Sequence, residues 1–162
     1  ELGHKDIAII TGNFEHYTSR GRLKGFLDAM KEADLIPVDE HIQCGDYSID
    51  GGYEAMLRIW DTKKRPTAIF ISNYDMTIGA YLAINYLRLK IPDDISVIGF
   101  DNFPLANVVN PPLSFAEQPT NVIGTEAGKL LYRRICGDYS DYPKTIMHKP
   151  TMHYKESIRQ LT

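Results

Sequence analysis

The pattern of apolar and polar positions is clearest between residues 66 and 101. Residues 68–71 (Ala-Ile-Phe-Ile) form an apolar run that is too short for a helix and rich in strand formers. Residues 76–89 carry apolar side chains at helical spacing, and residues 95–100 form a second short apolar run. A strand, a helix and a strand in this order predict a βαβ unit, which builds a parallel sheet covered on both faces.

The same two periodicities continue on either side of this unit. They predict further strands at residues 7–10, 40–44, 113–116 and 144–154, the last of them at a sheet edge because it contains Pro150. Helical patterns follow residues 19, 48 and 121, and a stiff irregular crossing separates residue 101 from residue 113. The predicted fold class is therefore α/β, with an open, mostly parallel Rossmann-like sheet and helices on both faces.

Polar residues at the start of each helical pattern are the expected N-caps, since their side chains can accept a hydrogen bond from the first turn. The expected caps are, in chain order, Thr18 or Ser19, then Ser48, then Asp75, and finally Thr120 or Asn121.

Polar side chains that follow the predicted strands indicate where a ligand would bind. Ligands of open α/β sheets lie beyond the carboxyl ends of the strands, where Asn73 and Asp101 are expected to share one edge. Arg22 is expected in the first turn of a helix beside this edge, where its charge opposes the helix dipole; it is either a ligand contact or a solvated arginine. Tyr47, in a loop before a helix, could stack on a flat or apolar ligand face.

Composition narrows the class of protein. The chain has 162 residues, 43% hydrophobic and 24% charged, which is typical of a soluble globular domain. A net charge of −3 argues against a broad basic surface for nucleic acid. Cys44 and Cys136 have no metal-binding spacing and are expected to be free and buried. No signal peptide and no membrane-spanning apolar stretch is recognised.

No catalytic constellation is found in the sequence. The five histidines are scattered, and there is no nucleophile elbow, phosphate-binding loop or dinucleotide fingerprint. We therefore expect no catalytic residues, no metal and no cofactor, and binding rather than turnover.

A set of motifs, in order over nearly the whole chain, resembles the lactose-repressor (LacI/GalR) family. The motifs are Gly-His-Lys at 3–5 before an Ile-rich strand, Arg-x-Arg-x-x-Gly-Phe at 20–26, Gly-Asp-Tyr-Ser at 45–48, Asn-x-x-Met-x-x-Gly-Ala at 73–80, Ile-Pro-Asp-Asp-Ile-Ser-Val-Ile-Gly-Phe-Asp at 91–101, Pro-Pro-Leu-Ser at 111–114 and Gln-Pro at 118–119.

The resemblance implies a cytoplasmic transcription regulator that responds to a small molecule, often a sugar. It implies the type I periplasmic-binding-protein-like fold, in which two α/β subdomains are hinged by crossing strands and the effector lies between them. Residues 1–101 then correspond to the C-terminal subdomain. Residues 102–162 correspond to the crossing, with a helix and a strand belonging partly to the N-terminal subdomain. The chain is expected to be a fragment that lacks the DNA-binding headpiece, so operator DNA would be contacted only through that missing part.

The resemblance also implies roles for particular residues. Arg22 matches the arginine that clamps effector hydroxyl or carboxylate groups, and Asn73 and Asp101 match its polar contacts. The expected effector-binding set is completed by Tyr47, Gln118 and Phe14. One departure leaves the effector open between a sugar and a nucleobase, because Tyr74 follows Asn73 where the family usually has Asp.

Two alternative functions share this type of fold. One is an extracytoplasmic sugar-binding protein of a transport system, and the other is an enzyme with a site around Asp101. Family members generally form homodimers, so a homodimer is expected here, and no contact with a membrane is expected. Apolar Leu105, Val108 and Val109 are candidate interface residues, with core packing as the alternative.

Overall fold

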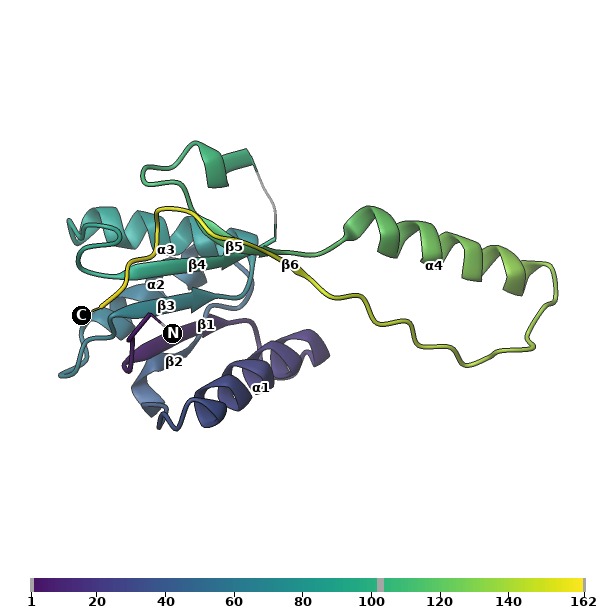
Figure 1. The fold of residues 1–162 in the computed structure, drawn as a ribbon, viewed down its shortest axis with the longest axis horizontal. Helices are drawn as coiled ribbons and strands as arrows, with labels where there is room; N and C mark the ends of the chain where they lie inside the picture. Colours follow the sequence, from purple (N-terminus) through teal and green to yellow (C-terminus); the bar gives the residue numbers. More distant parts are fainter. Residues whose placement is uncertain (1, 102–103, 162) are drawn as a thin grey trace.

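The computed structural model describes residues 2–101 and 104–161, and Figure 1 shows a sheet with helices packed against it and one helix that projects away from it. The strands are β1 (Ile7–Thr11), β2 (Ile42–Cys44), β3 (Ala68–Ile71), β4 (Ser96–Phe100), β5 (Ser114–Glu117) and β6 (Thr151–His153). The helices are α1 (Tyr17–Glu32), α2 (Ile49–Trp60), α3 (Tyr74–Tyr86) and α4 (Thr120–Ile135), with short 3₁₀ turns at Asp39–His41 and Pro104–Asn107.

The six strands form one sheet in the order β2-β1-β3-β4-β5-β6. The first five strands are parallel, and β6 pairs with β5 in the antiparallel direction. Because β3, α3 and β4 follow one another as strand, helix and parallel strand, the predicted βαβ unit is confirmed. The predicted fold class is confirmed with it.

Helices cover both faces of the sheet, as predicted. The chain moves outward from β1 to β2 through α1 and then back across β1 to β3 through α2, so right-handed connections place these two helices on opposite faces. The main core lies under α2 and α3, where alternate strand residues such as Ile10, Ile69, Ile71 and Val97 are fully buried.

Close packing of α2 on α3 depends on a residue without a side chain. A Cβ atom at Gly79 would overlap the backbone oxygen of Ile49 at the start of α2. The two helices therefore approach backbone to backbone at this point.

Helix α4 projects from the sheet (Figure 1); the two residues Gln118 and Pro119 join it to β5, and the long segment 136–150 joins it to β6. None of its residues is buried, and its apolar side chains Leu131 and Ile135 are 63% and 74% exposed. The final strand is shorter than the predicted 144–154, because only Thr151–His153 pair with β5. Its position at the sheet edge is confirmed.

The last described residues return to the sheet. The main chain of Ser157 accepts a hydrogen bond from the Val97 N–H at 2.8 Å and donates one to the Pro112 oxygen at 3.1 Å. Its buried side chain donates to the Val97 oxygen at 2.7 Å and accepts from the Ser114 N–H at 2.7 Å. This segment therefore joins β4 to β5 at their amino ends.

Some local predictions are confirmed and others are wrong. Ser48 caps α2 as predicted, with its side chain accepting from the Gly51 N–H. Helices α1 and α4 begin without a side-chain cap, after His16 and Pro119 respectively. Both cysteines are free as predicted, but neither is buried: Cys44 is half-buried, and Cys136 is exposed because it follows the uncovered end of α4.

The candidate interface residues divide between two environments. Val108 is 71% exposed, whereas Val109 packs against the main core. The side chain of Leu105 lies outside the part of the chain that the structure describes.

Candidate functional site

The carboxyl ends of the five parallel strands form one edge of the sheet. Because β5 is parallel to β4, its end lies at the same edge as those of β1 to β4. The loops that leave this edge carry the residues predicted from sequence, which are Phe14 after β1, Tyr47 after β2, Asn73 after β3, Asp101 after β4 and Gln118 after β5. We call this region the carboxyl edge.

Arg22 joins the ends of two strands at this edge. Its Nη1 donates a hydrogen bond to the Ser72 oxygen at 2.5 Å, and its guanidinium carbon lies 4.0 Å from the centre of the Phe100 ring. Ser72 directly precedes Asn73, and Phe100 directly precedes Asp101. The structure therefore brings the predicted arginine next to both of the predicted polar contacts.

The prediction that Arg22 lies in the first turn of a helix is wrong. Because α1 begins at Tyr17, Arg22 is the sixth residue of the helix and lies in the second turn rather than the first. The helix dipole acts mainly within the first turn, so it does not explain this position. The contacts with Ser72 and Phe100 explain it instead, since they fix a half-buried guanidinium between β3 and β4.

Asp101 and Gln118 meet directly at the ends of β4 and β5. The Gln118 Nε2 donates to Asp101 Oδ1 at 2.6 Å, and the Asp101 N–H donates to the Ala116 oxygen at 2.7 Å. Asp101 has a φ of 84°, in the left-handed region that residues with a side chain rarely adopt. Both residues line a cavity of about 330 Å³, together with Glu117, Thr120 and Asn121.

Asn73 caps helix α3, a role that was predicted for Asp75. Its Oδ1 accepts a hydrogen bond from the Met76 N–H at 3.0 Å, so Asn73 is the N-cap of α3 and the helix begins at Tyr74. The prediction that Asp75 caps this helix is wrong, because Asp75 already lies within the first turn. There its carboxylate favours the helix dipole.

Tyr47 is held by contacts within the protein. Its hydroxyl is hydrogen-bonded to Ser19 Oγ at 2.6 Å and to Thr18 Oγ1 at 3.0 Å. The His16 ring stacks on the Tyr47 ring, with centroids 5.7 Å apart and planes at 13°. Phe14, by contrast, is 44% exposed.

Sequence reasoning missed His16 and Ser19 as parts of the carboxyl edge. Ser19 is fully buried although it lies in the first turn of a surface helix. Ser19 was predicted to be a helix cap, so its hydrogen bond to Tyr47, 28 positions away in the sequence, was not expected. His16 could have been found from its place between the end of β1 and the start of α1, where a ligand-edge loop is expected.

The carboxyl edge carries chemical groups that suit a small polar molecule. It offers a guanidinium, side-chain amides, a carboxylate and aromatic rings, which is the mixture that recognises hydroxyl groups or ring heteroatoms. Within residues 2–101 and 104–161, no three His, Cys, Asp or Glu side chains are grouped so that they could hold a metal ion. None of the helices in these ranges is long and apolar enough to cross a membrane.

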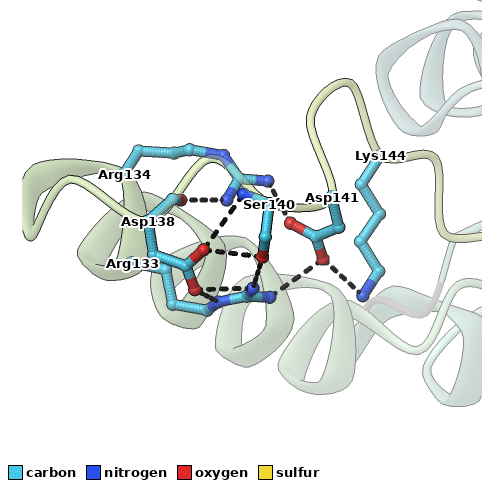
Figure 2. Close-up of polar contacts among 6 residues, drawn as sticks. All are labelled: Arg133, Arg134, Asp138, Ser140, Asp141 and Lys144. Atoms are coloured by element: carbon cyan, nitrogen blue, oxygen red, sulfur yellow. Dashed lines mark hydrogen bonds and ion pairs between the residues drawn. The ribbon is translucent and has the colours of Figure 1, made fainter.

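A second polar cluster lies away from this edge, at the end of α4. Figure 2 shows Arg133 and Arg134 pairing with Asp138 and Asp141 of the following loop. Hydrogen bonds from Ser140 and then Arg133 lower the pKa of Asp138 to about 2, and hydrogen bonds from Arg134 and Lys144 also lower the pKa of Asp141. The hydrogen bonds that Arg133 donates to Asp138 and Asp141 raise the pKa of Arg133. Because both arginines are matched by carboxylates, we interpret this cluster as a structural clasp for the loop.

Comparisons with known proteins point to one family. A family profile described as a periplasmic binding protein-like domain matches residues 1–158. The chain is 39% identical over 158 residues to the HTH-type transcriptional repressor PurR of Proteus mirabilis, a match that covers 98% of the chain and 46% of the repressor. The chain therefore spans about half the length of this curated relative.

Solved structures agree with the sequence matches. A LacI transcriptional regulator from Bacillus cereus subsp. cytotoxis superposes with a TM-score of 0.93 at 28% identity, covering 99% of this chain and 57% of the regulator. A complex of the transcriptional regulator CelR with cellobiose superposes with a TM-score of 0.89 at 28% identity, covering 96% of this chain and 47% of CelR.

Proposed function

The chain belongs to the periplasmic binding protein-like domain family, in its lactose-repressor (LacI/GalR) branch, and from this we propose that it is the effector-binding part of a bacterial transcription regulator. The observation that carries the proposal is the position of Arg22, which contacts the residues directly before Asn73 and Asp101. We propose that Arg22, Asn73 and Asp101, three polar groups of complementary chemistry, contact one small molecule at the carboxyl edge.

We place the division between subdomains at the crossing. Residues 1–101 form the C-terminal effector-binding subdomain, and residues 102–162 supply the crossing strands and a helix that belongs partly to the N-terminal subdomain. The exposed apolar side chains of α4 support this division, because such a surface is normally covered in a folded protein. DNA binding would require a headpiece outside these residues, and the regulator would act in the cytoplasm as a homodimer.

The effector is proposed to be a sugar or a related small metabolite. A sugar suits the carboxyl edge because a bidentate guanidinium, an amide and a carboxylate can together hold neighbouring hydroxyl groups. The complex of CelR with cellobiose supports this class. A nucleobase is the other effector class, since His16, Tyr47 and Phe14 gather aromatic surface at one end of the edge.

The transport-protein alternative is less well supported. The relatives named above are transcriptional regulators, and none is a transport protein or an enzyme. We therefore propose a binding function without catalysis.

The proposal is tested with Arg22→Ala in the full-length protein. A thermal-shift screen of sugars and purines first identifies a compound that stabilises the unaltered protein. Arg22→Ala should lose that stabilisation and the compound's effect on operator binding, while operator binding itself stays intact. Two charged hydrogen bonds to a ligand correspond to a loss of affinity of roughly 100-fold or more.

Arg65→Ala is the matched control. Arg65 also stacks on an aromatic ring, that of Trp60 at 4.9 Å, and donates to a backbone oxygen at 3.2 Å, but it precedes β3 at the opposite end of the sheet. An Arg22→Ala protein that responds to the compound as Arg65→Ala does would contradict the assignment of the site.

A further inference from the structure

The hydrogen bond between Gln118 and Asp101 connects two parts of the chain with different roles. Asp101 ends β4 and belongs to the carboxyl edge, whereas Gln118 ends the crossing strand β5 and is followed by Pro119 and then α4. At 2.6 Å between Nε2 and Oδ1, this is a short bond from an amide to a carboxylate. It links the side chain of Asp101 to the end of the strand that leads out to α4.

Asp101 needs support from its neighbours to hold its conformation. A φ of 84° is strained for a residue with a side chain, and it persists only when surrounding contacts hold it. Two such contacts come from β5 or its end, namely the Ala116 oxygen and the Gln118 amide. The direction of the Asp101 carboxylate is therefore set by the crossing strand.

An amide that donates to Asp101 Oδ1 has less capacity left for a ligand. A glutamine amide nitrogen carries two hydrogens, and one of them is used in this bond. The second carboxylate oxygen of Asp101 can meanwhile face the cavity of about 330 Å³ that both residues line. This geometry suits a supporting role for Gln118 better than the direct effector contact expected from sequence.

We infer that Gln118 is a positioning residue, which orients the Asp101 carboxylate and transmits effector binding to the crossing strand β5. The inference rests on the proposed function, since it takes Asp101 as an effector contact. Effector bound to Asp101 would stabilise the bond to Gln118, and through it the start of α4. A change in the direction of β5 would conversely turn the carboxylate and alter effector affinity.

The test is the pH dependence of binding in a Gln118→Glu variant of the full-length protein. The probes are cellobiose, D-ribose, adenine, guanine and hypoxanthine, each titrated by calorimetry at several pH values between about 5 and 8. In the variant two carboxyl groups lie at hydrogen-bonding distance and must share a proton, so the pKa of one of them rises. We expect affinity for the bound probe to be about tenfold lower near pH 8 and to recover as the pH falls, because the protonated pair restores the bond.

Gln43→Glu is the matched control for this variant. The Gln43 side chain is also hydrogen-bonded, with its Oε1 accepting from Arg58 at 2.8 Å, but its partner is a cation on α2. Its binding profile should follow that of the unaltered protein at every pH. A Gln118→Glu profile parallel to that of Gln43→Glu overturns the inference.

A second variant, Gln118→Leu, keeps the inference testable if Gln118→Glu does not fold. Hydrogen exchange is measured with and without saturating probe. In the unaltered protein the probe should slow exchange of the backbone amides of residues 116–118, 120 and 121, and in Gln118→Leu this protection should disappear although the probe still binds. Retained protection overturns the inference.

The outcomes separate the inference from the proposed function. If Arg22→Ala binds the probe as the unaltered protein does, or if no probe binds the unaltered protein, the effector site itself is wrong and the inference falls with it. If Arg22→Ala loses binding while both Gln118 variants behave as the unaltered protein does, only the positioning role of Gln118 is wrong.

Discussion

The ring of Tyr47 lies so close to the backbone of Gly12 that a methyl group at residue 12 would overlap its ring carbons. Gly12 directly follows β1, and Tyr47 lies in the loop after β2, so the contact fixes two neighbouring loops of the carboxyl edge to each other. The hydroxyl of Tyr47 then reaches Ser19 in α1. A residue without a side chain thus sets the position of an aromatic ring that was predicted to contact the effector.

Gly12→Ala should displace Tyr47 and weaken its bond to Ser19. We expect the free energy of unfolding to fall by about 1–3 kcal/mol, as is usual when a buried site is overpacked. Urea denaturation followed by circular dichroism measures this change. Gly21→Ala is the control, because a Cβ atom there meets nothing within 4 Å and alanine favours a helix by about 1 kcal/mol over glycine. Equal stability of the two variants would show that Tyr47 is free to move.

The two roles of Asn73 can be separated by substitution. Asn73→Ala removes the cap of α3 and should lower the free energy of unfolding by about 1 kcal/mol. Asn73→Ser keeps a side-chain oxygen suited to the cap but removes the amide group, so its stability should stay close to that of the unaltered protein. If Asn73 also contacts the effector, Asn73→Ser should bind the compound found by the thermal-shift screen about tenfold more weakly.

Asp75→Ala serves as the control for the cap. Asp75 lies in the first turn, where an acidic side chain contributes only a few tenths of a kcal/mol through the dipole. A larger loss of stability in Asp75→Ala than in Asn73→Ala would contradict the assignment of the cap.

The parallel sheet and its edge could be predicted from sequence because both depend on local patterns. Apolar runs such as 68–71 define strands, and the order of strands and helices defines the direction of each connection. The residues that follow the strands are then brought together by topology alone. This is why Asn73, Asp101 and Gln118 could be assigned to one edge.

The details of the carboxyl edge depend on contacts between distant residues, which a sequence pattern does not record. The site of Arg22 is set by a carbonyl 50 residues away and by the ring of Phe100. The predicted cap of α1 was wrong for a related reason. Ser19 has a side chain suited to a cap, but it is hydrogen-bonded to Tyr47, which lies 28 residues away. The exposed side of α4 shows the same limit, because an amphipathic pattern predicts a buried face without naming the surface that covers it.

The clasp at the end of α4 predicts a pH dependence. The pKa of the Asp138 carboxyl is lowered from 3.8 to about 2, first by the Ser140 hydroxyl and N–H and then by Arg133. A carboxyl whose pKa is lowered on folding contributes stability above its ordinary pKa, and this contribution is lost as the pH falls through the folded value. The ordered loop of residues 138–144 should therefore persist at pH 5 and loosen between about pH 4 and pH 2.

Carboxyl chemical shifts in an NMR titration measure this directly. Asp138 should titrate near pH 2 in the unaltered protein. In Ser140→Ala its midpoint should move up towards the ordinary value, because the largest cause of the shift is removed. A midpoint near 4 in the unaltered protein would mean that the clasp shown in Figure 2 does not form in solution.

Ser157 gives the strongest prediction about stability, because its side chain is fully buried and serves two main-chain groups. Its hydroxyl accepts from the Ser114 N–H and donates to the Val97 oxygen, both at 2.7 Å. Ser157→Ala leaves the Ser114 N–H in the interior without this acceptor, which costs about 1–3 kcal/mol. The free energy of unfolding measured in urea should fall by that amount, and exchange of the Ser114 amide with solvent should quicken.

Thr125→Ala, in the exposed middle of α4, controls for the loss of a hydroxyl group as such and should change stability by no more than about 0.5 kcal/mol. Ser157→Ala tests more than one bond, because Ser157 joins β4 to β5 below the edge where Asp101 and Gln118 meet. If Ser157→Ala is as stable as Thr125→Ala, the Ser157 hydroxyl does not hold these strands together. The main-chain pairing of β4 with β5 and the main-chain bonds of Ser157, which the substitution leaves in place, would then account for their spacing.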